Sequence, residues 1–144
     1  MGYRQAMLRI LIVEDSPAMR AYIRGALDGA PELGDELEIV EAASGFDALR
    51  LLPRSAYGLV ITDINMPDIN GLELIRFVRQ NAHQAAVALL VISTQSSERD
   101  RARALALGAD EFLAKPFAPE QLLDAVAKCL AVRRSSNPHG ESGA

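Results

Sequence analysis

Three nearly continuous apolar runs constrain the fold of this chain more than any other feature. They lie within residues 8–13, 58–63 and 87–92, and polar or charged residues follow each of them. A strand that is apolar at consecutive positions, rather than at alternate ones, is buried on both faces of its sheet. The runs therefore predict the central strands of a parallel sheet that is covered by helices on both sides.

Weaker patterns predict two more strands and the connecting helices. Residues 37–41 alternate between apolar and polar side chains, as in a strand at or near a sheet edge, and residues 110–114 form a short strand. Apolar residues at helical spacing predict five helices, which begin near residues 17, 45, 71, 97 and 119. The second of these helices is expected to turn Phe46, Leu49 and Leu52 towards the core. Strict alternation with right-handed crossovers predicts a doubly wound α/β fold of three layers.

The composition indicates a single globular domain. The chain has 144 residues, a formal net charge of −4, one cysteine and two histidines. No apolar run reaches the roughly 18 residues that a membrane-spanning helix needs, and no signal-peptide pattern precedes the first strand, so we expect a cytoplasmic protein. Cys129 lies in an apolar helical pattern and is expected to fill the core. The negative charge argues against a broad nucleic-acid-binding face.

The polar residues at the ends of the strands carry the functional prediction. Glu14 and Asp15 follow the first strand, Asp63 ends the third, Ser93 follows the fourth and Lys115 follows the fifth. In a parallel α/β sheet the carboxyl ends of the strands share one edge, where ligands bind. Three carboxylates, a hydroxyl and an ammonium group are therefore expected to converge there.

Three neighbouring carboxylates need positive charge to hold them together. Two like charges about 4 Å apart repel by roughly 4 kcal/mol at an effective dielectric constant of about 20. Lys115 supplies one positive charge, and a hard divalent cation such as Mg²⁺ is the expected second. We expect Asp15 and Asp63 as direct ligands, Glu14 as a ligand acting through water, and the backbone carbonyl of Asn65 as a further ligand.

With the cation bound, Asp63 has the chemistry of a nucleophile towards phosphorus, while Lys115 and Ser93 can bind the phosphoryl oxygens. The product is an acyl phosphate. An aspartyl-nucleophile phosphatase is the remote alternative, because it needs a second Asp two residues later, where this chain has Asn65. A dinucleotide-binding enzyme is disfavoured, since no Gly-rich turn follows the first strand.

These residues give the chain a resemblance to the receiver domains of two-component response regulators, which it shows over about residues 7–132. The matching motifs are Glu14-Asp15, Asp63 to Pro67 with Gly71, Ser93, and Lys115 to Phe117. The resemblance implies a flavodoxin-like sheet of five parallel strands in the order 2-1-3-4-5. It implies a cis bond between Lys115 and Pro116. It also implies that the domain is no enzyme beyond catalysing its own phosphorylation and dephosphorylation.

The same resemblance implies a role for each residue of the site. Asp63 receives a phosphoryl group from a histidine kinase or a histidine phosphotransfer protein, with Mg²⁺ as the cofactor. Ser93 and Phe112 form a switch pair that alters a protein-binding face made by the fourth helix, the fifth strand and the fifth helix. Asn65 and Gln95 occupy positions that tune the loss of the phosphate to water.

Residues 7–132 are expected to form the receiver domain, and residues 133–144 a disordered tail or linker. Because no output domain is visible, the first interpretation is a stand-alone regulator that binds another protein. The alternatives are a receiver domain from a longer, for example DNA-binding, regulator and a scaffold that never takes phosphate. Direct nucleic-acid binding and membrane insertion are not expected, and His83 is expected at the surface.

Overall fold

The computed structural model describes residues 7–34, 36–81, 84–95 and 97–135. They contain one parallel sheet of five strands in the order β2-β1-β3-β4-β5, which confirms the predicted fold. The strands are β1 (Leu8–Val13), β2 (Leu37–Ala42), β3 (Leu59–Asp63), β4 (Ala88–Ser93) and β5 (Glu111–Ala114).

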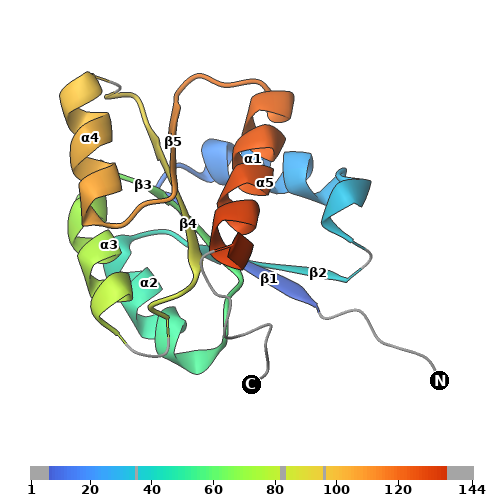
Figure 1. Ribbon diagram of the computed structural model, residues 1–144, viewed down its shortest axis with the longest axis horizontal. Helices are drawn as coiled ribbons and strands as arrows, with labels where there is room; N and C mark the ends of the chain where they lie inside the picture. Colours follow the sequence, from blue (N-terminus) through green and yellow to red (C-terminus); the bar gives the residue numbers. More distant parts are fainter. Residues whose placement is uncertain (1–6, 35, 82–83, 96, 136–144) are drawn as a thin grey trace.

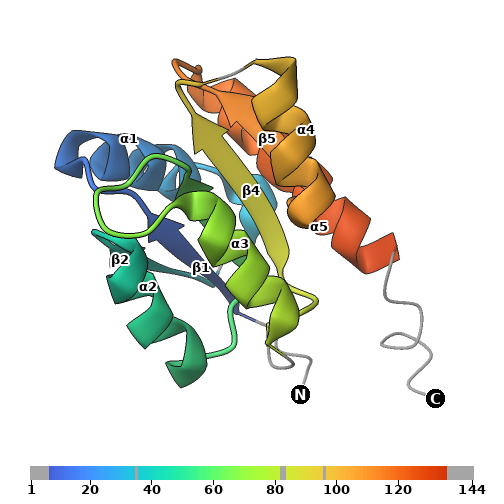
Figure 2. The same cartoon turned by 90° about the vertical axis from the view of Figure 1, so that its left-hand side faces the viewer.

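Helices cover both faces of this sheet. In Figure 1 and Figure 2, α1 and α5 lie together on one face, and α2, α3 and α4 lie on the other. Short 3₁₀ turns at Pro31–Leu33 and Leu52–Arg54 lie in the connections before β2 and β3. The helices are α1 (Pro17–Asp28), α2 (Gly45–Leu51), α3 (Gly71–Gln80), α4 (Glu98–Leu107) and α5 (Pro119–Ser135).

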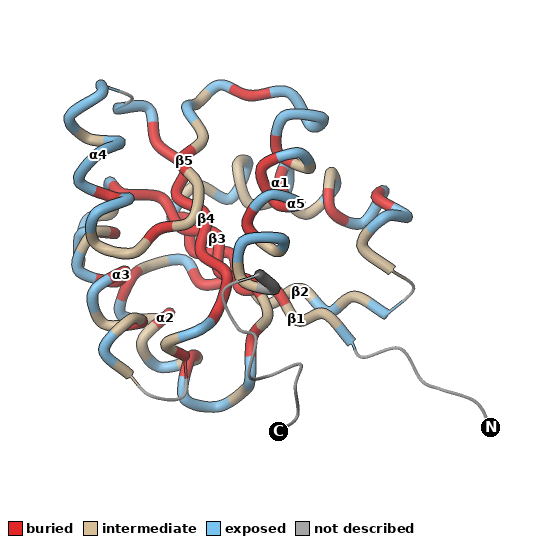
Figure 3. Tube along the Cα trace, viewed as in Figure 1, coloured by how far each residue is buried: buried red, intermediate tan, exposed pale blue. Residues whose placement is uncertain are grey.

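Alternating side chains of the central strands divide the core into two halves. In β1, Leu11 and Val13 pack with α2 and α3, whereas Ile10 and Ile12 pack with α1 and α5. All four are inaccessible to solvent. Figure 3 shows this burial along the central strands and the inner faces of the helices. Burial on both faces explains why the strands are apolar at consecutive positions.

Helix α2 departs from the prediction in the residues that it buries. Phe46 is 62% exposed, so its predicted inward position is wrong. Leu52, directly after the helix, is buried as predicted and Leu49 is partly buried, while Gly45 and Ala48 form the buried face of α2 itself. A Cβ at Gly45 would lie 1.5 Å from Cγ2 of Ile69, which shows how closely this face approaches the neighbouring loop. Small residues give a weak apolar signal, and the larger Phe46 obscured it.

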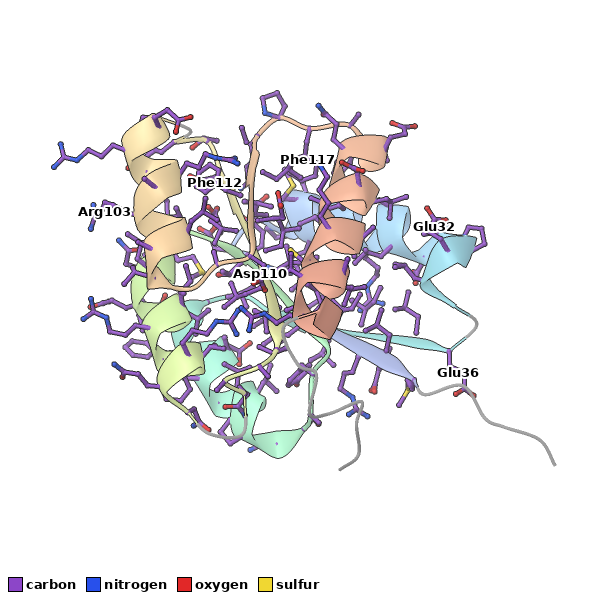
Figure 4. The ribbon with its side chains drawn as sticks, viewed as in Figure 1. Glu32, Glu36, Arg103, Asp110, Phe112 and Phe117 are labelled. Atoms are coloured by element: carbon purple, nitrogen blue, oxygen red, sulfur yellow. The ribbon has the colours of Figure 1, made fainter. Side chains whose placement is uncertain are left out.

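The end of α5 also differs from the prediction, because the helix continues to Ser135. Nη2 of Arg133 lies 2.7 Å from Oδ1 of Asp110, which immediately precedes β5 (Figure 4 shows Asp110 between α4 and α5). Residues 133–135 are therefore helical rather than a linker. His83 and residues 136–144 lie outside the described residues. Among the described helices, none has the length and apolar character needed to cross a membrane.

Candidate functional site

The register of the sheet brings the ends of neighbouring strands to one edge, as predicted. Asp63 pairs with Ile92, the residue before Ser93, and Ser93 pairs with Ala114, the residue before Lys115. The functional side chains therefore follow one another across β3, β4 and β5. The first strand, β1, lies on the other side of β3 and ends at the same edge.

Lys115 joins two of the three acidic residues at this edge. Its Nζ lies 2.9 Å from Oε1 of Glu14 and 2.9 Å from Oδ2 of Asp63. Glu14 is 1% exposed and Asp63 is 6% exposed, whereas Asp15 is exposed and has no ion pair within the described part of the chain. Carboxylate oxygens of all three acids lie within 4.8 Å of one another. One ammonium group therefore faces three carboxylates, and negative charge is in excess.

Burial shifts the protonation equilibria of this cluster. Removal from water raises the pKa of the Glu14 carboxyl, and the nearby charge of Asp63 adds to this, although hydrogen bonds from Lys115 and the Ser16 N–H oppose it. Burial by itself lowers the pKa of the Lys115 ammonium group, but its hydrogen bonds to Glu14 and Asp63 outweigh burial and raise it. Lys115 therefore remains positively charged at neutral pH.

The loop after β3 holds Asp63 from the side opposite Lys115. Oδ1 of Asp63 accepts a hydrogen bond from the Asn65 N–H at 3.2 Å, and the Gly71 N–H donates to the Ile64 carbonyl at 2.8 Å. A Cβ at Gly71 would lie 2.2 Å from the carbonyl oxygen of Asp63, so only glycine fits there without displacing the strand end. Both carboxylate oxygens of Asp63 thus have fixed partners, and the Asn65 residue is exposed.

The predicted switch residues lie on neighbouring strands. Ser93 is completely buried, and its Oγ accepts a hydrogen bond from the Gln95 N–H at 2.9 Å. Within the described residues, no hydrogen bond joins Ser93 Oγ to Asp63 or Lys115. Phe112 is already buried, with 7% of its surface exposed, and it packs in the core on the α2, α3 and α4 side. Gln95 is exposed beside this edge.

Arg20 is a supporting residue that the sequence did not reveal. Its Nη1 donates to the Glu14 carbonyl at 2.8 Å, and its Nε lies 3.0 Å from Oε1 of Glu41 in β2. Arg24, one turn later in α1, pairs with the other oxygen of Glu41 at 2.6 Å. The spacing of the two arginines is visible in the sequence, but their shared partner in another element is not.

A second supporting contact fixes the loop after β5. The Tyr22 hydroxyl in α1 donates to the Phe117 carbonyl at 2.7 Å, and the two rings lie 5.8 Å apart between centroids. The bond between Lys115 and Pro116 is cis, as predicted. These contacts hold the segment that carries Lys115 against α1.

The donor set fits a hard divalent cation. Mg²⁺ is bound through oxygen atoms, usually with only one or two protein carboxylates. Asp15 is exposed and has no ion-pair partner in the described chain, so its oxygens are the most available, and a carboxylate oxygen of Asp63 lies within 4.8 Å of one of them. Glu14 is the most buried of the three acids, and both of its oxygens have partners, Lys115 Nζ at 2.9 Å and the Ser16 N–H at 3.0 Å.

Comparison with known proteins agrees with this geometry. The sequence matches the response regulator receiver domain family over residues 10–127. The chain belongs to this family. It is 34% identical over 116 residues to the chemotaxis protein CheY1 of Helicobacter pylori, covering 80% of this chain and 90% of CheY1. The structure of the chemotaxis response regulator CheY4 of Vibrio cholerae has a TM-score of 0.78 and 30% identity, covering 87% of this chain and 100% of that chain.

Another relative is about twice as long as the region that it shares with this chain. The chain is 38% identical over 133 residues to a probable transcriptional regulatory protein of Picosynechococcus, covering 88% of this chain. The chain spans about half of that protein, 49% of its length. It is thus the receiver domain of a two-component response regulator, a signalling domain rather than a classical enzyme.

Proposed function

We propose that this receiver domain accepts a phosphoryl group on Asp63 from a histidine kinase or a histidine phosphotransfer protein. The observation that carries the proposal is the environment of its carboxylate. Asp63 is 6% exposed at the strand end, with Lys115 Nζ 2.9 Å from one oxygen and the Asn65 N–H 3.2 Å from the other. A carboxylate held in this way is oriented for attack on phosphorus, and orientation is a large part of phosphoryl transfer.

In the proposed transfer, a carboxylate oxygen of Asp63 forms a bond to phosphorus while the phosphorus–nitrogen bond of the donor histidine breaks. The leaving imidazole nitrogen keeps the bonding electron pair and takes up a proton. Lys115 exchanges part of its hydrogen bonding to Asp63 for a phosphoryl oxygen, and Ser93 Oγ binds another. Asn65 and Gln95, both exposed at this edge, tune the later attack of water on the acyl phosphate.

The proposed cofactor is Mg²⁺, bound by Asp15, Asp63 and the backbone carbonyl of Asn65, with Glu14 acting through water. When bound, it supplies positive charge for the phosphoryl oxygens. The excess of negative charge among three carboxylate groups within 4.8 Å supports this assignment. Lys115, whose Nζ lies 2.9 Å from Oδ2 of Asp63, would contribute a second positive charge.

The proposed output is a change in the face formed by α4, β5 and α5. A groove of about 290 Å³ on this face is lined by Arg101, Phe112, Gln121 and Lys128, among others. Because Phe112 lines the groove and neighbours the strand of Ser93, a change in its position alters a surface that a protein partner can bind. The ring of Phe112 is buried in this structure. The proposed switch therefore requires that the ring also adopts a second position, turned outward, in the unphosphorylated protein.

The relatives support two settings for this output. The coverage of CheY1, 90% of its length, favours a stand-alone regulator that binds a downstream protein. The 49% coverage of the Picosynechococcus transcriptional regulator supports the alternative of a receiver within a longer, DNA-binding protein. In either setting we propose that this domain itself acts in the cytoplasm without contacting nucleic acid directly or inserting into a membrane.

Intact-mass measurement tests the proposal. The full chain is incubated with Mg²⁺ and a small phosphodonor, alongside Asp63→Asn and the control Asp124→Asn, an exposed carboxylate on α5. We expect one added phosphoryl group in the wild type and the control, and none in Asp63→Asn or with a chelator. Modification that persists in Asp63→Asn would contradict the proposed acceptor, and no modification of the wild type would favour the scaffold alternative.

A further inference from the structure

Asp68 joins the loop after β3 to the amino end of α2. Its Oδ1 accepts hydrogen bonds from the Gly45 N–H at 3.2 Å and from the Ile69 N–H at 2.8 Å. Its Oδ2 accepts the Phe46 N–H at 2.8 Å. These N–H groups hold the pKa of the Asp68 carboxyl at about 2, with the Phe46 N–H as the largest cause. The carboxylate is therefore a charged acceptor throughout the neutral range.

Helix α2 already has caps of its own, so Asp68 adds a contact of a different kind. The N-cap residue Ser44 accepts the Asp47 N–H through its Oγ at 3.1 Å, and Asp47 accepts the N–H of Ala43, the residue before the N-cap, at 3.3 Å. Asp68 reaches the same helix end from 22 or 23 residues away in the sequence. Asp68 adds a hydrogen-bonded link between two separate elements, the loop after β3 and the amino end of α2. We call this link the tie.

The tie lies next to the acceptor site. The loop is fixed at Asp63 and Ile64 by the hydrogen bonds to Asn65 and Gly71 described above, and Asp68 fixes its far side. Only residues 65–67 lie between these two anchor points. The first of them carries the backbone carbonyl that we assign to the cation.

We propose that Asp68 is a positioning residue, which fixes the loop that carries Asn65 and thereby increases the affinity of the site for Mg²⁺. This inference rests on the proposed function. Asp68 itself does not bind the cation: it holds the loop against α2 through N–H groups, and close packing of Ile69 on Gly45 completes the contact. Release of the tie frees the loop on one side, so the carbonyl of Asn65 is less well placed for the cation.

The test measures Mg²⁺ binding to the full chain by isothermal titration calorimetry. Asp68→Asn keeps the shape of the side chain but removes its charge, and Asp47→Asn is the matched control at the same helix end. We expect the Kd for Mg²⁺ to rise about tenfold in Asp68→Asn, as for other residues that orient metal ligands, and to stay within twofold of wild type in Asp47→Asn. Gly45→Ala, which pushes Ile69 away, should raise the Kd as well.

Urea unfolding of the same variants separates positioning from simple stabilisation. A purely structural role predicts that Asp68→Asn lowers the free energy of unfolding while its Kd equals that of the wild type, and that result overturns the inference. If the wild type binds Mg²⁺ and Asp68→Asn binds it with the same Kd, the role proposed for Asp68 is wrong, but the proposed function stands. Wild-type protein that does not bind Mg²⁺ overturns the proposed function and this inference together.

Discussion

Two clusters of charged residues lie at opposite ends of the parallel strands. We call the side with the carboxyl ends of the strands the carboxyl edge and the side with their amino ends the amino edge. The charges of the two clusters are neutralised in opposite ways. At the carboxyl edge, three acids, Glu14, Asp15 and Asp63, lie within 4.8 Å of one another, and the single ammonium group of Lys115 pairs with only two of them, Glu14 and Asp63. At the amino edge, the single carboxylate of Asp110 pairs with two guanidinium groups, those of Arg79 at 3.2 Å and Arg133 at 2.7 Å.

Hydrogen bonding distinguishes the two clusters further. Asp110 also accepts the Leu89 N–H at 2.9 Å, and Arg79 donates to the carbonyls of Gly108 at 2.9 Å and Val87 at 2.6 Å. The amino edge is therefore a closed network that joins α3, β4, β5 and α5. The carboxyl edge leaves Asp15 exposed and without an ion pair in the described chain. The cluster at the amino edge therefore stabilises the fold, whereas the cluster at the carboxyl edge keeps a charge imbalance that a ligand can relieve.

The largest expected effect is at the amino edge. Asp110→Ala leaves two guanidinium groups and a backbone N–H without their shared acceptor, so we expect the free energy of unfolding to fall by about 3–5 kcal/mol. Urea denaturation measures this. The control Asp124→Asn breaks an exposed pair with Lys128 on α5 and should cost less than about 0.5 kcal/mol. Equal losses in both variants would show that the amino-edge network has no special role.

Removal of an acid at the carboxyl edge should have the opposite sign. Asp15→Asn removes repulsion from Glu14 and Asp63, whose oxygens lie within 4.8 Å, and it breaks no ion pair within the described part of the chain. We expect the free energy of unfolding without Mg²⁺ to rise by about 1 kcal/mol, since the exposed position keeps the effective dielectric constant high. The gain should shrink in about 1 M NaCl, because salt screens exposed charges. A destabilised Asp15→Asn protein would contradict the charge imbalance.

The smallest expected effect is the pH dependence at Asp68. Its pKa is about 2 in the folded protein against an ordinary value of 3.8, so its contribution to stability is complete above pH 3.8 and is lost as the pH falls through about 2. The difference in unfolding free energy between wild type and Asp68→Asn should therefore shrink between these pH values. Urea titrations at several pH values measure it, and a difference that grows on acidification would contradict the assigned hydrogen bonds.

The sequence predicted the carboxyl edge better than the amino edge for a physical reason. Asp63 and Lys115 follow apolar strands, and the topology of a parallel sheet brings strand ends together without knowledge of any single contact. Arg133 pairs with Asp110, which lies 23 residues away in the sequence. Asp68 accepts hydrogen bonds from the N–H groups of Gly45 and Phe46, which lie 23 and 22 residues away. No local sequence pattern marks such pairs. Phe46 was misplaced because Gly45 and Ala48, which form the buried face, give little apolar signal.

The dependence of stability on Mg²⁺ tests the contrast between the two edges most directly. Binding to the folded protein alone adds about 2.7 kcal/mol at a concentration 100 times the Kd. In urea unfolding with and without Mg²⁺, we predict that wild type and Asp110→Asn gain this stability equally and that Asp15→Asn gains much less. An Asp15→Asn protein that gains as much as wild type, or an Asp110→Asn protein that gains nothing, would contradict a cation site at the carboxyl edge alone.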